Sequence, residues 1–120
     1  MSSIAGYRGL PNSTGYGPSK SALNNLAESL YFDFKRHNVR VCLVSPGFIK
    51  TPLTDKNDFK MPILKSPEYS ADQIFEGLVN KNTFEIHFPK SLTITLKLLS
   101  FLPSKIYFGL VGKLTKYQKK

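Results

Sequence analysis

The sequence is poor in the residues that form covalent or metal cross-links. It contains one cysteine, Cys42, and two histidines among its 120 residues, and it has no tryptophan. One cysteine excludes an intramolecular disulfide, and one cysteine with two histidines falls short of the four ligands of a usual structural zinc site. We therefore expect an intracellular protein without a metal site.

Acidic residues are missing from the C-terminal part of the chain. All eight lie at or before Glu85, whereas residues 86–120 carry seven lysines, and the net charge is +9. A basic segment of this kind meets nucleic acid, an anionic membrane surface, or only water.

Long apolar runs are also missing. Lys97 and Lys105 interrupt the apolar runs of the tail, which fall short of the roughly 20 residues that a membrane-spanning helix needs. The N-terminus carries no basic cluster followed by an apolar run, so no signal peptide is expected. These absences favour a cytoplasmic protein that touches a membrane at its periphery if at all.

The length is that of one modest domain, and its periodicity indicates alternating helices and strands. Turn-forming residues fill positions 1–15, and leucines recur at helical spacing from Leu23 to Leu30. The pattern predicts helices over about 19–36, from Ser70 or Asp72 to about Asn80, over about 92–102 and over about 104–117. It predicts buried strands over 39–44 and 84–88, with an irregular connection over 50–69. The expected fold class is thus α/β.

Tyr16 and Lys20 are the first residues that point to chemistry. They are four positions apart, so a helix that has begun by Tyr16 places both on one face. An ammonium group one helical turn away favours the negatively charged phenolate, which suits a tyrosine that exchanges a proton with a substrate. A hydroxyl from Ser3, thirteen residues upstream, would hold the substrate oxygen during that exchange.

A tyrosine and a lysine at this spacing are common on helices, so the pair alone is a weak signal. Ser3 at its offset, the small residues Ala5 and Gly6, and a strand followed by a Pro-Gly pair strengthen it. With these features the chain resembles the short-chain dehydrogenase/reductase family. In that family a serine precedes the tyrosine of a Tyr-x-x-x-Lys motif by thirteen residues, and a Pro-Gly pair follows the next strand.

The resemblance implies a catalytic set of three residues. Ser3 matches the serine that orients the substrate, and Tyr16 matches the acid/base. Lys20 matches the lysine that supports the tyrosine and binds the ribose hydroxyls of the nicotinamide. The implied reaction is hydride transfer between NAD or NADP and a small-molecule carbonyl or alcohol substrate.

The resemblance also implies a cofactor-binding segment after the first predicted strand. Pro46 and Gly47 match the turn beside the nicotinamide, and the backbone of Phe48 and Ile49 would lie nearby. Thr51 matches the threonine that helps to hold the cofactor, and Tyr16 and Lys20 contact it as well. Residues 52–69 resemble the segment that covers the substrate.

The matching positions resemble the C-terminal half of a doubly wound, Rossmann-type parallel sheet. Residues 1–90 would form the catalytic half, with two strands and flanking helices, and residues 91–120 an amphipathic basic helical tail. The glycine-rich phosphate loop and the asparagine motifs of the family do not occur in these 120 residues. We therefore expect a truncated fragment whose helix bearing Tyr16 exposes an apolar face.

Two strands cannot complete a dinucleotide crevice, so little or no cofactor binding is expected from the chain alone. The residue that distinguishes NADP from NAD would belong to the absent half, which leaves that choice open. The alternative is a non-enzymatic remnant that acts as an interaction or peripheral membrane-binding module. Relatives pair through the helix that bears the tyrosine, so a homo-oligomer is expected for the full-length enzyme.

The tail allows more than one interpretation. In the last predicted helix, lysines (Lys105, Lys113, Lys116, Lys120) lie on one side and apolar residues (Ile106, Leu110, Leu114, Tyr117) on the other. Such a helix suits an anionic bilayer, but its apolar side would equally close the substrate pocket or a subunit contact. Nucleic-acid binding is not expected, because the aromatic residues group with the apolar side and not among the lysines. Cys42, His37 and His87 are expected to be structural, with Cys42 buried in mid-strand.

Overall fold

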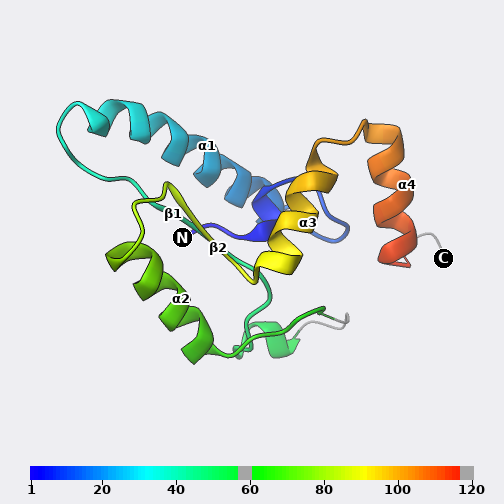
Figure 1. Cartoon of the computed structure of the whole chain (residues 1–120). Helices are drawn as coiled ribbons and strands as arrows, with labels where there is room; N and C mark the ends of the chain where they lie inside the picture. The colour runs from blue at the N-terminus through cyan, green and yellow to red at the C-terminus, as the bar shows by residue number, and fades with distance from the viewer. Residues whose placement is uncertain (57–60, 117–120) are drawn as a thin grey trace.

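The computed structural model of the chain describes residues 1–56 and 61–116. These residues form a small α/β fold in which two short parallel strands lie between helices, as in part of a Rossmann-type sheet (Figure 1). The elements are the short 3₁₀ turns η1 (Ile4–Gly6) and η2 (Thr54–Lys56), the strands β1 (Leu43–Pro46) and β2 (Glu85–Phe88), and the helices α1 (Tyr16–Lys35), α2 (Pro67–Val79), α3 (Lys90–Ser100) and α4 (Ser104–Leu114). The α/β class and the parallel strand pair predicted from sequence are confirmed.

The two strands pair in register from Leu43 opposite Glu85 to Pro46 opposite Phe88. The backbone N–H of Ser2 donates to the carbonyl of Val44 at 2.7 Å, so the first residues run along the other edge of β1. Helices α1 and α2 lie on opposite sides of this pair, which is the layering of a doubly wound sheet (Figure 1).

The core forms where β1, β2 and α2 meet. Val44, Ile86 and Phe88 are buried there, and Tyr69 and Ile74 of α2 pack against them. Phe88 is completely buried, and its ring meets that of Tyr69 edge-on at a centroid distance of 6.0 Å. Apolar residues of both strands thus hold α2 against the sheet, as expected for buried parallel strands.

Gly77 allows α2 to approach β2 closely. A Cβ atom at this position would lie 2.5 Å from Cδ1 and Cγ1 of Ile86, whereas one at Gly109 in α4 would meet no described atom within 4 Å. We expect Gly109→Ala to raise the free energy of unfolding by about 0.5–1 kcal/mol through helix propensity. Gly77→Ala, also in a helix, should lower it by about 1–3 kcal/mol through overpacking. Urea unfolding of both variants measures the difference, and equal effects would contradict the packing described here.

Several predicted boundaries are wrong. The helix predicted from about residue 19 begins at Tyr16. The strand predicted over 39–44 begins only at Leu43, because the pairing with β2 starts there, and Val39 instead donates its N–H to Phe34 at the end of α1. Cys42 accordingly precedes the strand and is only half-buried. The helix predicted from Ser70 or Asp72 begins at Pro67, because the Ser66 hydroxyl accepts from the N–H of Tyr69.

The two tail helices are confirmed as α3 and α4, but the packed side of α4 differs from the predicted apolar side. Tyr107 and Val111 are the buried residues of α4. The apolar residues of the predicted side, Ile106, Leu110 and Leu114, are exposed, and the predicted positions 117 and 120 lie outside the described residues. The contact of Tyr107 with the N-terminal loop, described below, sets this orientation.

Helix α1 exposes apolar side chains, as expected from the sequence. Among them, Leu26 is 51% and Phe32 70% exposed, and Gly17 is the one buried residue of this helix. None of the helices in residues 1–56 and 61–116 is long and apolar enough to cross a membrane.

Candidate active site

The N-terminal turn is bound to α1 by polar contacts. The Ser2 hydroxyl donates to Oδ1 of Asn24 at 2.5 Å and lies 3.2 Å from the carbonyl oxygen of Lys20. In return, the carbonyl of Gly6 accepts hydrogen bonds from the Ser21 hydroxyl at 2.8 Å and from Nδ2 of Asn24 at 3.1 Å. The turn that contains Ser3 is therefore fixed against the second and third turns of α1.

Gly6 is required for this close approach. A Cβ atom there would lie 2.8 Å from Nδ2 of Asn24 and 2.9 Å from the carbonyl carbon of Lys20. A backbone carbon at that distance cannot move away without shifting the helix. The small residue noted in the sequence thus has a packing reason that spacing alone did not reveal.

Tyr16 and Lys20 lie together at the start of α1. Tyr16 is the first residue of the helix and is 53% exposed. The Nζ of Lys20 lies 5.4 Å from the centroid of its ring and donates a hydrogen bond to the carbonyl of Met1 at 3.3 Å. A cation thus stands beside a phenol that solvent or a ligand can reach.

Ser3 caps η1, the turn that is bound to α1. Its side chain is buried, and its hydroxyl oxygen accepts from the N–H of Ala5 at 3.2 Å. A serine hydroxyl that accepts one hydrogen bond still has its own O–H to donate. The structure therefore brings Tyr16 and Lys20 together and binds the turn of Ser3 to the same helix.

The predicted cofactor segment lies at the C-terminal end of the strand pair. Pro46 ends β1, and the N–H of Gly47 continues the ladder to the carbonyl of Phe88 at 2.8 Å. The carbonyl of Phe48 accepts from the N–H of Lys65 at 2.9 Å, which joins this segment to the end of the connection over 50–69. The hydrogen bonds of residues 47 and 48 thus involve other partners than the hydrogen bonds that fix the turn of Ser3 to α1.

Thr51 lies in a turn closed by Thr54. The hydroxyl of Thr54 donates to the carbonyl of Ile49 at 2.8 Å and accepts from the N–H of Thr51 at 2.8 Å. The Thr51 hydroxyl lies 3.3 Å from that of Thr54. These hydrogen bonds close a turn over residues 49–54. The substrate-covering segment predicted over 52–69 includes residues 57–60, which lie outside the described residues.

A half-buried charged cluster ties the Ser3 turn to the rest of the fold. Tyr7, immediately after η1, donates its hydroxyl to Oε1 of Glu85 at 2.8 Å, and Lys97 of α3 pairs with Oε2 of the same carboxylate. Sequence analysis missed this cluster because Tyr7 and Glu85 are 78 positions apart. Its sequence signal was Glu85 itself, the last acidic residue before a lysine-rich tail.

The cluster shifts the titration of its members. Burial alone would raise the pKa of Glu85, but the hydrogen bonds from Lys97 and Tyr7 together with the charge of Lys97 lower it below its ordinary value. Burial, and then the hydrogen bond and charge of Glu85, raise the pKa of Tyr7 well above its usual range. Glu85 is therefore ionised and Tyr7 is a neutral donor at neutral pH.

This arrangement predicts the pH dependence of stability. Because the folded-state pKa of Glu85 is lowered, its contribution is fully present above its ordinary pKa of 4.5 and is lost as the pH falls through the folded value. We expect the unfolding free energy of the wild type to fall more steeply below pH 4.5 than that of Glu85→Gln. Urea unfolding of both proteins at steps of one pH unit, from about pH 6 to about pH 3, measures the two slopes. Parallel curves would show that the carboxylate is not held ionised by the fold.

Cys42 and His87 show no arrangement for catalysis. Burial is the largest effect on the Cys42 thiol, and it raises the pKa, which disfavours the reactive thiolate. The Nδ1 of His87 lies 2.6 Å from the hydroxyl of Thr93 in α3, and burial followed by the charges of Lys97 and Lys90 lowers its pKa. Both residues fit the structural roles that the sequence predicts.

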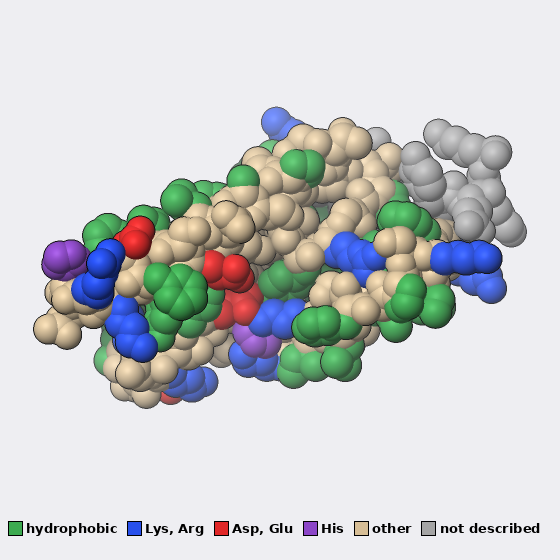
Figure 2. All heavy atoms as spheres, turned by 90° about the horizontal axis from the view of Figure 1, so that it is seen from above, with side chains coloured by type: hydrophobic (Ala, Val, Ile, Leu, Met, Phe, Trp, Pro, Cys, Tyr) green, Lys and Arg blue, Asp and Glu red, His purple; other side chains and the backbone are tan. Residues whose placement is uncertain are grey.

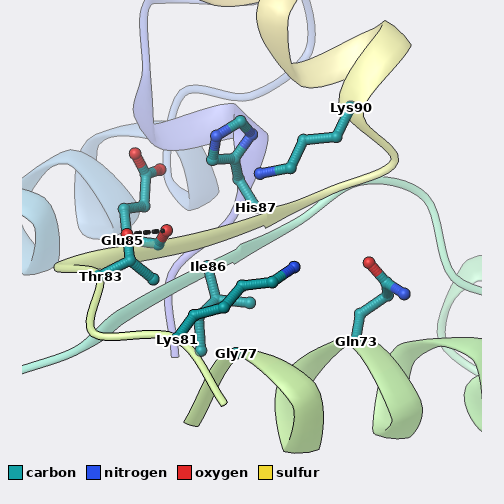
Figure 3. Close-up of a pocket in the computed structure, with 8 residues that line it drawn as sticks. All are labelled: Gln73, Gly77, Lys81, Thr83, Glu85, Ile86, His87 and Lys90. Carbon is teal, nitrogen blue, oxygen red and sulfur yellow. Dashed lines mark hydrogen bonds between the residues drawn. The ribbon is translucent and has the colours of Figure 1, made fainter.

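A pocket opens between α2 and β2 and is lined by Gln73, Gly77, Lys81, Thr83, Glu85, Ile86, His87 and Lys90. Figure 3 shows Glu85 and His87 on one face of β2, with Lys81 and Gln73 on the side of α2. None of the residues that the sequence assigns to catalysis or cofactor binding lines it. In residues 1–56 and 61–116, no group of three or more His, Cys, Asp or Glu residues is arranged to hold a metal.

The loop after η1 is also clamped by the tail. Arg8 donates to the carbonyls of Ser100 at 2.9 Å and of Leu102 at 2.5 Å, and its guanidinium lies 4.1 Å from the ring centroid of Tyr107. The Tyr107 hydroxyl donates to the carbonyl of Gly9 at 2.8 Å. The loop between Ser3 and Tyr16 is therefore held from α1 on one side and from the α3–α4 turn on the other.

Comparison with known proteins agrees with these local features. The family model of the short chain dehydrogenases matches residues 1–61, which contain Ser3, Tyr16, Lys20 and the segment 46–51. An uncharacterized oxidoreductase of Myxococcus xanthus is 35% identical over 107 residues, which are 89% of this chain and 42% of the relative.

Two further relatives match over shorter stretches. An NADP-dependent (R)-specific alcohol dehydrogenase of Lentilactobacillus kefiri is 46% identical over 57 residues, covering 46% of this chain and 23% of the relative. A 3-oxoacyl-(acyl-carrier-protein) reductase of Thermotoga maritima is 38% identical over 56 residues, covering 47% and 23%. The chain thus spans less than half the length of each of these relatives. Because the family model matches half of the residues of this chain, the chain belongs to the short-chain dehydrogenase family.

Proposed function

We propose that this chain supplies the catalytic half of an NAD(P)-dependent oxidoreductase that interconverts a small carbonyl compound and its alcohol. The observation that carries the proposal is the Lys20 ammonium 5.4 Å from the ring of the half-exposed Tyr16, at the contact between α1 and the turn of Ser3. A proton donor, a cation and a second hydroxyl at one junction are the groups that carbonyl reduction requires.

The residues at the ends of the strands suit a nicotinamide nucleotide. Ligands of parallel sheets bind beyond the carboxyl ends of the strands, and residues 46–51 follow directly on the end of β1. Lys20 offers ammonium donors for ribose hydroxyls, and Thr51 offers a hydroxyl in a closed turn. The cofactor, when bound, supplies the hydride that reaches the carbonyl carbon.

The chain's own residues would manage the proton. In the direction of reduction, Tyr16 would transfer its phenolic proton to the carbonyl oxygen, which becomes the hydroxyl of the alcohol. Ser3 donates a hydrogen bond to the same oxygen and holds it in place. Lys20 stabilises the phenolate left on Tyr16 until a proton from water restores the phenol.

The names of the relatives support this substrate class. One is an NADP-dependent alcohol dehydrogenase and another reduces a 3-oxoacyl group, so both names describe a carbonyl and alcohol pair. We propose NAD or NADP as the cofactor without choosing between them. We also propose a homo-oligomer for the complete enzyme, with the exposed apolar side chains of α1 at the subunit contact.

The test is a chimera in which this chain replaces the matching segment of the M. xanthus relative. We expect the chimera to bind NADH or NADPH and to oxidise it in the presence of a panel of small ketones and a 3-oxoacyl thioester. The 120-residue chain alone, measured by calorimetric titration, should show little or no cofactor binding. A folded chimera that binds the cofactor but reduces none of these carbonyls would contradict the proposal.

A further inference from the structure

Large apolar side chains are exposed around the turn between α3 and α4. Leu98 is 65% and Phe101 84% exposed at the end of α3, and Ile106 is 52% and Phe108 63% exposed in the first turns of α4. These four residues fall within eleven positions of one helix–turn–helix segment. Large apolar side chains exposed this close together in sequence favour an interaction surface on this segment.

The same region is basic. Lys105 and Lys113 of α4 are exposed, as is Lys116 just beyond its end. The sequence has no acidic residue after Glu85, which is already paired with Lys97. Figure 2 shows acidic side chains only toward the α1 end and the middle of the molecule, while the end with α3 and α4 presents hydrophobic and basic side chains. A partner for this surface must accept apolar groups and carry negative charge.

Two backbone carbonyls of the α3–α4 turn are already hydrogen-bonded within the chain. Unpaired carbonyls are costly to remove from water. At this turn, Arg8 donates to the carbonyls of Ser100 and Leu102, on either side of Phe101, which is 84% exposed. Phe101 can therefore enter a less polar layer without stripping water from these two groups.

The charge argues against a second copy of the chain as the partner. A symmetric contact places the same patch on both subunits, so two positively charged patches would meet. Like charges brought together at an interface are repelled. An anionic lipid surface offers apolar depth and the opposite charge at once.

We propose that the α3–α4 segment binds the chain peripherally to an anionic bilayer. Its lipid-docking surface consists of four apolar residues and two lysines: Leu98, Phe101, Ile106, Phe108, Lys105 and Lys113. The apolar residues insert at the level of the headgroups, and the lysines meet the lipid phosphates. This proposal concerns the tail and is independent of the oxidoreductase activity.

Co-sedimentation of the 120-residue chain with lipid vesicles tests the proposal. We expect the chain to pellet with vesicles of phosphatidylcholine and phosphatidylglycerol at low salt, and to remain in solution with phosphatidylcholine alone. High salt should weaken the binding, because it screens exposed charges. Both Leu98→Ser/Phe101→Ser and Lys105→Glu/Lys113→Glu should reduce the partition coefficient by about tenfold or more.

A matched double variant on α1, Phe32→Ser/Lys35→Glu, removes one exposed apolar residue and one lysine elsewhere and should leave binding unchanged. Far-UV circular dichroism checks that all variants keep the helical content of the wild type. The proposal is overturned if the chain fails to pellet at low salt, if neutral vesicles bind it equally, or if the α1 control loses as much binding as the tail variants. It is also overturned if light scattering shows a dimer that Phe101→Ser abolishes while vesicle binding persists.

Discussion

Tyr16→Phe in the chimera is expected to lower kcat for ketone reduction by about 10²–10⁴-fold. The substitution removes one oxygen and keeps the ring beside the Nζ of Lys20, so the fold and the cofactor affinity should change little. Because Tyr16 is 53% exposed, the loss of its hydroxyl should cost the fold little stability. Steady-state kinetics with a fixed ketone measures the effect, and fluorescence titration with NADPH checks cofactor binding.

Tyr31→Phe is the matched control for this substitution. Tyr31 lies on the same helix and is 36% exposed, but it is about four turns beyond Tyr16. Its loss should leave kcat unchanged within about twofold, as for surface substitutions away from a site. A Tyr16→Phe chimera as active as the Tyr31→Phe chimera would remove Tyr16 from the mechanism.

Lys97→Met is expected to lower the unfolding free energy of the chain by about 1–3 kcal/mol. The substitution leaves the Glu85 carboxylate half-buried with Tyr7 as its donor and without a cation. A fully buried pair would lose more, but the side chain of Lys97 is 33% exposed and that of Glu85 17%, so solvent screens part of the effect. The urea midpoint at neutral pH measures the change.

Two further variants separate the ion pair from the loss of a surface lysine. Lys105→Met, on the exposed side of α4, should change stability by less than about 0.5 kcal/mol. Adding Glu85→Gln to Lys97→Met should recover part of the loss, because no unpaired charge then remains in the half-buried cluster. Additive losses in the double variant would mean that the two residues act independently.

The sequence was sufficient for the parts of the fold that depend on local patterns. The spacing of Tyr16 and Lys20, the periodic leucines of α1 and the apolar runs around Val44 and Ile86 gave the helix, the strand pair and the pairing of the two site residues. These features depend on residues within one or two turns of each other or on burial of whole segments. Periodicity reports both kinds of feature.

Sequence patterns failed where distant side chains decide the structure. Strand β1 begins at Leu43 because its pairing with β2 starts there, and not because of its own valines. Helix α4 buries Tyr107 because the hydroxyl of Tyr107 donates to the carbonyl of Gly9 and its ring packs against Arg8. Arg8 lies more than 90 positions before the carbonyls it binds. Periodicity within one segment carries no information on contacts with another segment, so the contacts of Arg8 and Tyr107 that hold the loop between Ser3 and Tyr16 were not predictable.

The most direct test of the account is a crystal structure of the chimera with NADP⁺ and an alcohol product. The account predicts that the hydroxyls of Ser3 and Tyr16 both lie about 2.6–3.2 Å from the alcohol oxygen. Lys20 should stand between the phenol of Tyr16 and the ribose. A structure in which the two hydroxyls point to different sides of the bound alcohol would contradict the account.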